Sequence, residues 1–283
     1  MNRPKTFAAL LAAVLVFVSP LSALVPSSRV TDDEAREIGR KIWQNESSGK
    51  ILVMWDDLCD CASLGISNWL WYQDGKPHVF DATFLDLVDY LDKNGAQVPG
   101  WMRGRPAAPW KDLAAFRADR DSARVAELNA LLGSTIALQA RFSAMRLEAA
   151  LPKMLEAAPE SERREIRRQF ERVARSPGGF YPLVDYVNFK GEGTEPKERY
   201  PDAKLGRPQG WGLLQVLEGM KGDGSGPEAI DEFVRSAKAA LTRRVENAPA
   251  DVEGRESPRM KDKKWLGIWL RRLDTYKTSK PLK

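Results

Sequence analysis

The 283-residue chain has few of the side chains that build metal sites: two cysteines, Cys59 and Cys61, and one histidine, His78. These are too few for a structural zinc site without help from carboxylates, so we expect neither a metal nor a cofactor. An oxidising compartment would favour pairing of the two cysteines, but a bridge between positions i and i+2 closes a very small, strained loop. A bridge, two small buried thiols and a redox-labile pair all remain open.

Several motifs of other enzyme classes are also absent. The chain contains neither GxGxxG nor GxxxxGK[ST], so a loop that cradles phosphate groups is not expected. Without a GxSxG motif, a Ser–His–Asp hydrolase would have to use His78, which falls in a predicted turn. Nucleic-acid binding would rest on the net charge of +5 alone, so we expect no nucleic-acid partner.

Long apolar runs are missing except at the N-terminus. There, Arg3 and Lys5 precede an apolar stretch at 7–18 and a small-residue cleavage site near Ala23, which is typical of a signal peptide over residues 1–23. The stretch is short for a transmembrane span, although an uncleaved anchor is the alternative. We therefore expect a periplasmic or secreted protein that is not stably inserted in the membrane after signal cleavage.

The remaining sequence predicts one mainly α-helical (α+β) domain over residues 30–276, with a small β-hairpin at about 50–72 and a basic tail at 277–283. Nine tryptophans and a hydrophobic content of 43% support a sizeable core. Apolar residues at helical spacing predict helices at 31–46, 81–95, most of 110–175, 180–190, 211–220, 227–249 and 262–276. Pro152 should kink or end the long helix in which it lies, and Trp265, Trp269 and Leu273 should face the scaffold. The oligomeric state is not predictable.

The helix at 31–46 ends in an unusual acid. Thr31 and Glu34 form a capping box at its start, and Glu46 continues the apolar stripe that includes Ile42, one i,i+4 step earlier. Burying a carboxylate costs several kcal/mol unless it is paired or protonated. We therefore expect a semi-buried acid at this helix end.

A hairpin rich in carboxylates should follow the helix. Residues 47–49 break the helix, and 51–55 predict a strand. Asp56, Asp57 and Asp60 crowd the turn, and 63–72 predict a single return strand or extended arm. Glu46 is expected to face this hairpin.

This stretch resembles the active-site segment of the phage-type lysozymes, which have a glutamate at the end of the first helix, an aspartate in the hairpin and Thr-Ile-Gly-x-Gly-His on the return strand. It is more similar still to a group of exported bacterial lysozyme-like proteins of unknown role. The matching residues are Trp43-Gln44-Asn45-Glu46, Ser63-Leu64-Gly65-Ile66, Trp71 and Tyr72. The chain departs from the pattern at Ser67-Asn68, in place of Gly-His, and at Cys59, in place of a glutamate.

The resemblance implies a lysozyme-like fold and a muramidase that cleaves the β-1,4 linkage of peptidoglycan. Glu46 would be the general acid, Asp57 the second carboxylate, and Ser63 would position a water molecule. Chitin and chitosan are alternative substrates. The rival hypothesis is a non-catalytic envelope protein of the same fold that binds glycan or a protein partner.

The resemblance also directs attention to residues that could contact the glycan. In lysozyme-like folds a helix end rich in Asn and Gly lines the far wall of the cleft, and the segment around Asn188 has this character. The candidates for substrate binding are Asp56, Asn68, Trp71, Asn188, Lys190, Glu192, Gln209 and Trp211. The residues from 188 to 211 are equally compatible with an ordinary solvated loop.

Overall fold

Helices make up about 60% of the described residues, and one small sheet accompanies them. The computed structural model describes residues 30–78, 80–250 and 256–277. The predicted signal peptide and residues 278–283 of the predicted tail lie outside the described residues. The helices are α1 (Asp32–Ser47), α2 (Phe84–Lys93), α3 (Leu113–Ala118), α4 (Ala123–Ser134), α5 (Ile136–Ala157), α6 (Glu160–Ala174), α7 (Phe180–Lys190), α8 (Leu213–Glu218), α9 (Pro227–Asn247) and α10 (Pro258–Asp274). The prediction of a mainly α-helical fold with a small β element is confirmed.

The first helix begins and ends as its sequence predicts. The Thr31 side chain accepts a hydrogen bond from the Glu34 amide at 3.2 Å, and the Glu34 carboxylate accepts one from the Thr31 amide at 2.9 Å. The helix ends at Ser48, whose φ of 56° lies in the left-handed region. This cap ends the helix two residues after Glu46, and β1 begins at Val53.

The sheet has three antiparallel strands in the order β1 (Val53–Asp56), β2 (Cys61–Leu64) and β3 (Trp69–Trp71). The prediction of one return strand over 63–72 is wrong, because a turn at 65–68 divides it into β2 and β3. Gly65 has a φ of 75° and Asn68 a φ of 55°, a left-handed conformation that glycine and asparagine tolerate best. The turn is held to α5, because the Ile66 amide donates to the Gln139 side-chain oxygen at 3.0 Å.

The two cysteines are paired. Cys59 and Cys61 form a disulfide across the turn between β1 and β2, with Cα atoms 5.3 Å apart. The alternatives of two buried thiols and a free redox-labile pair are therefore wrong. The bridge limits the conformations of residues 59–61, at the end of the turn that leads into β2.

Pro152 does not end the long helix. Helix α5 continues through it to Ala157, although proline removes one backbone hydrogen bond from the helix interior. The neighbouring side chains of Leu151, Met154 and Leu155 are buried, and this packing offsets the lost bond. Of the two outcomes predicted at Pro152, a kink or an end of the helix, the end is wrong.

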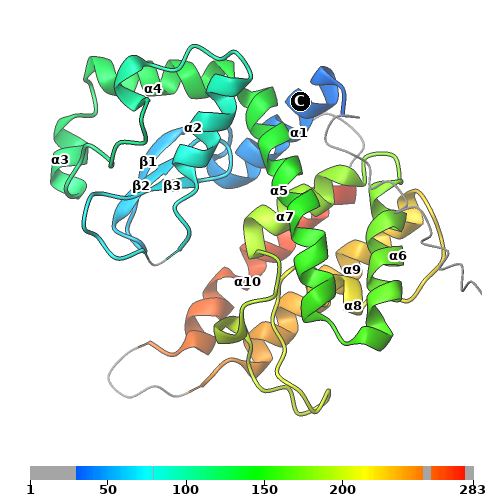
Figure 1. Cartoon of the computed structure of the whole chain (residues 1–283). Coiled ribbons are helices and arrows are strands. Elements are labelled where there is room, and N and C mark those ends of the chain that lie inside the picture. The colour runs from blue at the N-terminus through cyan, green and yellow to red at the C-terminus, as the bar shows by residue number, and fades with distance from the viewer. Residues whose placement is uncertain (1–29, 79, 251–255, 278–283) are drawn as a thin grey trace, which may run out of the picture.

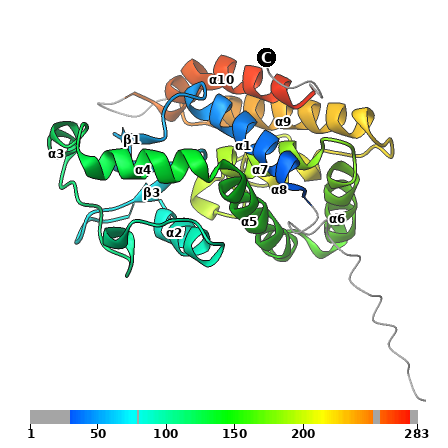
Figure 2. The same cartoon turned by 90° about the horizontal axis from the view of Figure 1, so that it is seen from above.

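Helices α1 and α5 pack on one another between two groups of elements (Figure 1). The sheet, α2, α3 and α4 lie on one side, and α6 to α10 lie on the other. Helices α9 and α10 run side by side (Figure 2). One cluster of buried hydrophobic side chains includes members from Val30 to Tyr276. Among the described residues, no helix has both the length and the apolar character needed to cross a bilayer.

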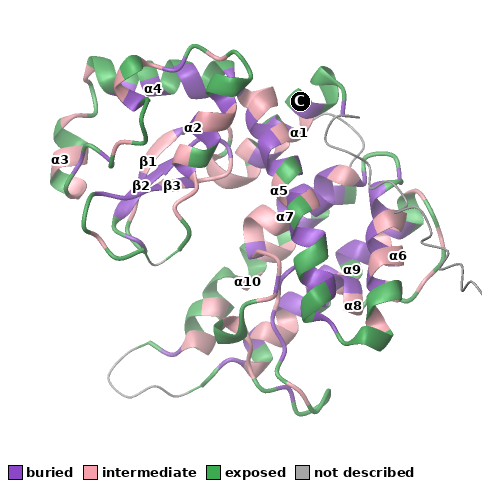
Figure 3. Cartoon of the chain, viewed as in Figure 1, coloured by how far each residue is buried: buried purple, intermediate pink, exposed green. Residues whose placement is uncertain are grey.

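Helix α10 contributes little to this cluster. Leu273 is its one buried residue, and Figure 3 shows the helix mostly in the colours of exposed and partly exposed residues. Trp265 is 50% exposed, so the prediction that it faces the scaffold is wrong. Trp265 lines a pocket together with Asp262 and Trp269 of the same helix.

Candidate ligand-binding site

Glu46 lies where α1 meets the sheet and α10. Its Oε1 atom accepts a hydrogen bond from Arg272 Nη2 at 2.6 Å, and its Oε2 atom accepts one from Asn68 Nδ2 at 2.8 Å. The side chain is 15% exposed. Both oxygens of this carboxylate are therefore engaged, one of them in an ion pair. Paired burial explains how the acid can continue an apolar stripe.

Arg272 joins Glu46 to a second, fully buried carboxylate. Asp185 on α7 is 0% exposed and accepts hydrogen bonds from Arg272 Nε at 2.9 Å and Nη2 at 2.8 Å. The Tyr276 hydroxyl donates to the same carboxylate at 2.6 Å. Burial by itself lowers the pKa of Arg272, but the charges of Asp185 and Glu46 outweigh it and hold that pKa well above its ordinary value. This network fastens α10 to α1 and α7.

The other predicted catalytic residues, Asp57 and Ser63, and the predicted substrate contact Asp56 are not part of this network. Asp57 is exposed in the turn between β1 and β2. The Asp56 carboxylate accepts a hydrogen bond from the Leu58 amide at 2.8 Å, which is a turn-forming contact. Ser63 is 1% exposed in β2, and its hydroxyl has no hydrogen-bond partner among the described residues. None of the three contacts Glu46 through a hydrogen bond or ion pair within the described residues.

Three predicted ligand contacts have structural partners instead. The Trp71 indole is buried in the core, where it donates to the Pro106 carbonyl at 2.9 Å. Asn188 donates to the Ser67 hydroxyl at 3.3 Å. Gln209 is buried and pairs with Tyr200 through two backbone hydrogen bonds, of 2.9 and 2.8 Å.

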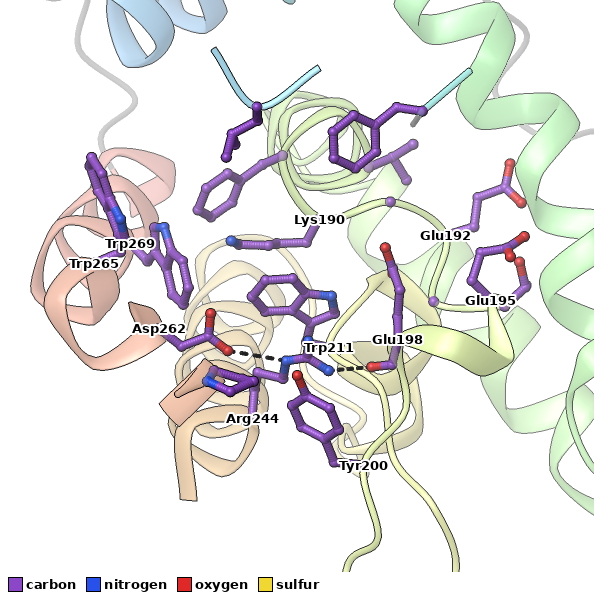
Figure 4. A pocket seen from close by; sticks show the side chains of 18 of the residues that line it. Lys190, Glu192, Glu195, Glu198, Tyr200, Trp211, Arg244, Asp262, Trp265 and Trp269 are labelled. Atoms are coloured by element: carbon purple, nitrogen blue, oxygen red, sulfur yellow. Dashed lines mark hydrogen bonds and ion pairs between the residues drawn. The ribbon is translucent and has the colours of Figure 1, made fainter. Parts of the chain in front are cut away.

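Three other predicted ligand contacts meet in one cavity. Lys190, Glu192 and Trp211 line a pocket of about 1050 Å³ between α7, α9, α10 and the loops beside the sheet (Figure 4). The pocket reaches Leu58 in the β1–β2 turn and Asp81 before α2. Its other notable lining residues are Glu195, Glu198, Tyr200, Arg244, Asp262, Trp265 and Trp269. Glu46 does not line this pocket.

Lys190 lies in the middle of the pocket wall, surrounded by aromatic rings. Its Nζ atom is 3.5 Å from the ring centroid of Trp269, 4.0 Å from that of Trp211 and 4.2 Å from that of Phe189. Only 9% of the residue is exposed. Burial lowers the pKa of Lys190 well below its ordinary value, and the positive charge of Arg272 acts in the same direction.

Arg244 lies against the other side of Trp211. Its guanidinium carbon is 4.4 Å from the Trp211 centroid and 3.7 Å from the Tyr200 centroid. In Figure 4, Lys190 lies on one side of Trp211 and Arg244 on the other. Arg244 also pairs with Asp262 at 3.4 Å and donates to the Glu198 carbonyl. Because cations cover Trp211, the half-exposed Trp265 is the indole that presents a free surface to a ligand.

Charge in the pocket is divided between two regions. Glu192, Glu195 and Glu198 lie together on one side in Figure 4, and Lys190 points away from them toward Trp269. Glu192 is paired with Lys153 at 3.4 Å. Hydroxyl donors of a ligand suit the carboxylate side, and the indole rings suit the C–H faces of a sugar. Among the described residues, no group of three or more acidic, histidine or cysteine side chains is placed to hold a metal.

Sequence reasoning missed most of the pocket. Arg244 and Asp262 come from two helices whose sequences indicate only amphipathic scaffold. Trp265 could have been noticed, because three basic residues at 261, 263 and 264 immediately precede it. Arg272, the partner of Glu46, lies 226 residues away in sequence. No local pattern relates positions that far apart.

Comparison of the chain with known proteins finds no relative. The resemblance to the active-site segment of the phage-type lysozymes therefore stays a prediction, which rests on about thirty residues of this sequence. Compared with models of known families, with curated proteins and with solved structures, the chain matches none of them.

Proposed function

We propose that this protein binds glycan, and that peptidoglycan or a related envelope polysaccharide occupies the pocket around Lys190 and Trp265. The signal peptide predicted at residues 1–23 supports a location in the periplasm or outside the cell. The observation that carries the proposal is the pocket itself, about 1050 Å³ in volume, where indole rings adjoin paired and unpaired charges. Saccharides are bound in such sites by apolar ring faces and a few oriented polar groups.

Pelleting with purified cell walls tests this proposal. The wild-type protein should sediment with the walls, and Trp265→Ala should weaken binding about tenfold, the effect of losing about 1.4 kcal/mol of contact. Met260→Ala is the matched control, because Met260 is an exposed apolar residue of the same helix that does not line the pocket. Equal sedimentation of Trp265→Ala and wild type, or no sedimentation of either, would contradict glycan binding at this pocket.

A second candidate function, glycoside hydrolysis, is favoured by the position of Glu46. Its side chain is partly exposed where α1, the sheet and α10 meet. A general acid must reach the leaving oxygen of the substrate, and both carboxylate oxygens of Glu46 already accept hydrogen bonds, from Arg272 and Asn68. Hydrolysis would therefore require one of these two partners to leave Glu46 when substrate binds.

Reducing-end release from cell walls separates the two functions. Glycan binding without hydrolysis predicts that wild type, Glu46→Gln and Asp57→Asn all pellet with walls and release no sugar. Hydrolysis predicts release by the wild type and a loss of at least a hundredfold in Glu46→Gln, the usual contribution of general acid catalysis. The second pattern would replace the binding proposal with the enzymatic one.

A further inference from the structure

The Lys190 ammonium is a buried cation without a polar partner. Among the described residues, no hydrogen bond or ion pair reaches its Nζ atom, although an ammonium has three donors. Its contacts are the ring faces of Trp269, Trp211 and Phe189, at 3.5 to 4.2 Å. The three donors of Nζ open into the pocket, where they are available to an acceptor on a ligand.

The charged groups around Lys190 do not supply that acceptor. Asp262 and Arg272 face it from α10, Arg244 faces it from α9, and Glu46 faces it from α1. The Asp262 carboxylate pairs with Arg244 at 3.4 Å, and the Glu46 carboxylate pairs with Arg272 at 2.6 Å. Both carboxylates are thus engaged by arginines, while Lys190 and Arg244 flank the Trp211 ring.

We propose that Lys190 is the specificity-determining residue of this pocket and binds the carboxylate of an acidic saccharide. The proposal rests on the proposed glycan binding and adds to it the chemical class of the ligand. A carboxylate would accept the hydrogen bonds of Nζ and compensate its charge in a site partly shielded from water. The adjacent indoles of Trp265 and Trp269 would contact the apolar face of the same sugar.

The acidic side of the pocket limits how much negative charge the ligand carries. Glu192, Glu195 and Glu198 lie on the side away from the tip of Lys190 (Figure 4). These carboxylates would repel a polyanion but accept hydrogen bonds from sugar hydroxyls. One carboxylate at Lys190 and neutral hydroxyls toward the glutamates therefore match the charge of the site best.

Titration calorimetry with two matched disaccharides tests the proposal. One probe is N-acetylglucosaminyl-N-acetylmuramic acid with its lactyl carboxylate free, and the other is diacetylchitobiose, which lacks that group. At pH 6 and low salt, wild type should bind the acidic probe about 10- to 100-fold more tightly, as a charge-assisted contact permits. Lys190→Met should bind both probes equally, and Lys190→Arg should retain part of the preference. Lys93→Met, a change to an exposed lysine at the end of α2 that does not line the pocket, should leave the preference unchanged.

Proton linkage provides a second readout. Because the pKa of Lys190 is lowered in the free protein, a bound carboxylate should cause the protein to take up a proton at alkaline pH. Calorimetry in two buffers of different ionisation enthalpy should detect this uptake in wild type and not in Lys190→Met.

The outcomes separate this inference from the proposed function. Equal affinity of wild type for the two disaccharides would overturn the carboxylate site and leave glycan binding intact. A preference for the acidic probe that Lys190→Met retains would also overturn the role of Lys190. If neither disaccharide bound, both proposals would fail.

Discussion

Replacing Asp185 with asparagine is expected to destabilise the protein more than any change to an exposed carboxylate. Asp185 is fully buried and accepts hydrogen bonds from Arg272 and Tyr276. In Asp185→Asn the negative charge is lost, and the side-chain NH2 group, which is itself a donor, replaces one of the oxygens that accept from Arg272 and Tyr276. Removing one partner of a buried ion pair costs about 3–5 kcal/mol because the other charge remains buried.

The structure also predicts how the loss of stability ranks among three carboxylate substitutions. Glu46→Gln should cost less, about 1–2 kcal/mol, because Glu46 is partly exposed and Arg272 keeps its pair with Asp185. Asp274→Asn, which removes an exposed partner of Lys238 at the end of the same helix, should cost under about 1 kcal/mol. For a chain of this size 1 kcal/mol corresponds to roughly 2–4 °C in Tm. Asp185→Asn should therefore lower the Tm by roughly 10 °C.

Urea denaturation followed by far-UV circular dichroism measures these differences, with scanning calorimetry as a check on the Tm. The reasoning would be refuted if Asp185→Asn were no less stable than Asp274→Asn. It would also be refuted if Glu46→Gln cost more than Asp185→Asn, because that result would make Glu46 the main partner of Arg272.

Three further changes have expected outcomes. Lys190→Met should raise the free energy of unfolding at pH 6, and this gain should be smaller at pH 9.5. Between the lowered pKa of Lys190 in the folded protein and the ordinary lysine pKa, the unfolded wild type binds one more proton than the folded wild type, so wild-type stability rises with pH. Urea titrations at both pH values measure the gain, and a gain independent of pH would contradict this reasoning. Gly39→Ala should destabilise the protein by about 1–3 kcal/mol, because the new Cβ would lie 2.7 Å from Ile136 Cγ2. Gly267→Ala is the control, because its Cβ would meet its nearest neighbour, Arg271 Nη1, at 3.6 Å. In the same assay this second change should be neutral or stabilising by up to about 1 kcal/mol. Reducing the disulfide should lower the Tm by roughly 3–6 °C, because the loss of chain entropy in the unfolded state gives a three-residue loop about 1.5 kcal/mol of stabilisation. Differential scanning fluorimetry measures this change, and the Tm of Cys59→Ser should not respond to reductant.

Local signals in the sequence predicted much of the secondary structure. The capping box of Thr31 and Glu34 predicted the start of α1, because both partners lie within one turn of helix. The same reasoning placed the acid-rich turn after β1. It failed at residues 65–68, where Gly65 and Asn68 adopt a left-handed backbone that alternation of apolar residues does not reveal.

The candidate site likewise has residues that the sequence identifies and contacts that depend on tertiary packing. From the sequence by itself, Glu46 could be identified as an acid on an apolar helix face. A polar and aromatic group near helix ends could also be identified, made up of Lys190, Glu192 and Trp211. Both patterns are defined by residues that are near neighbours in sequence. Only the tertiary structure decided that Arg272 pairs with Glu46, that Trp269 lies against Lys190, and that Arg244 lies against Trp211. Those contacts join residues tens to hundreds of positions apart, and their geometry is set by how α7, α9 and α10 pack, which helical periodicity does not encode.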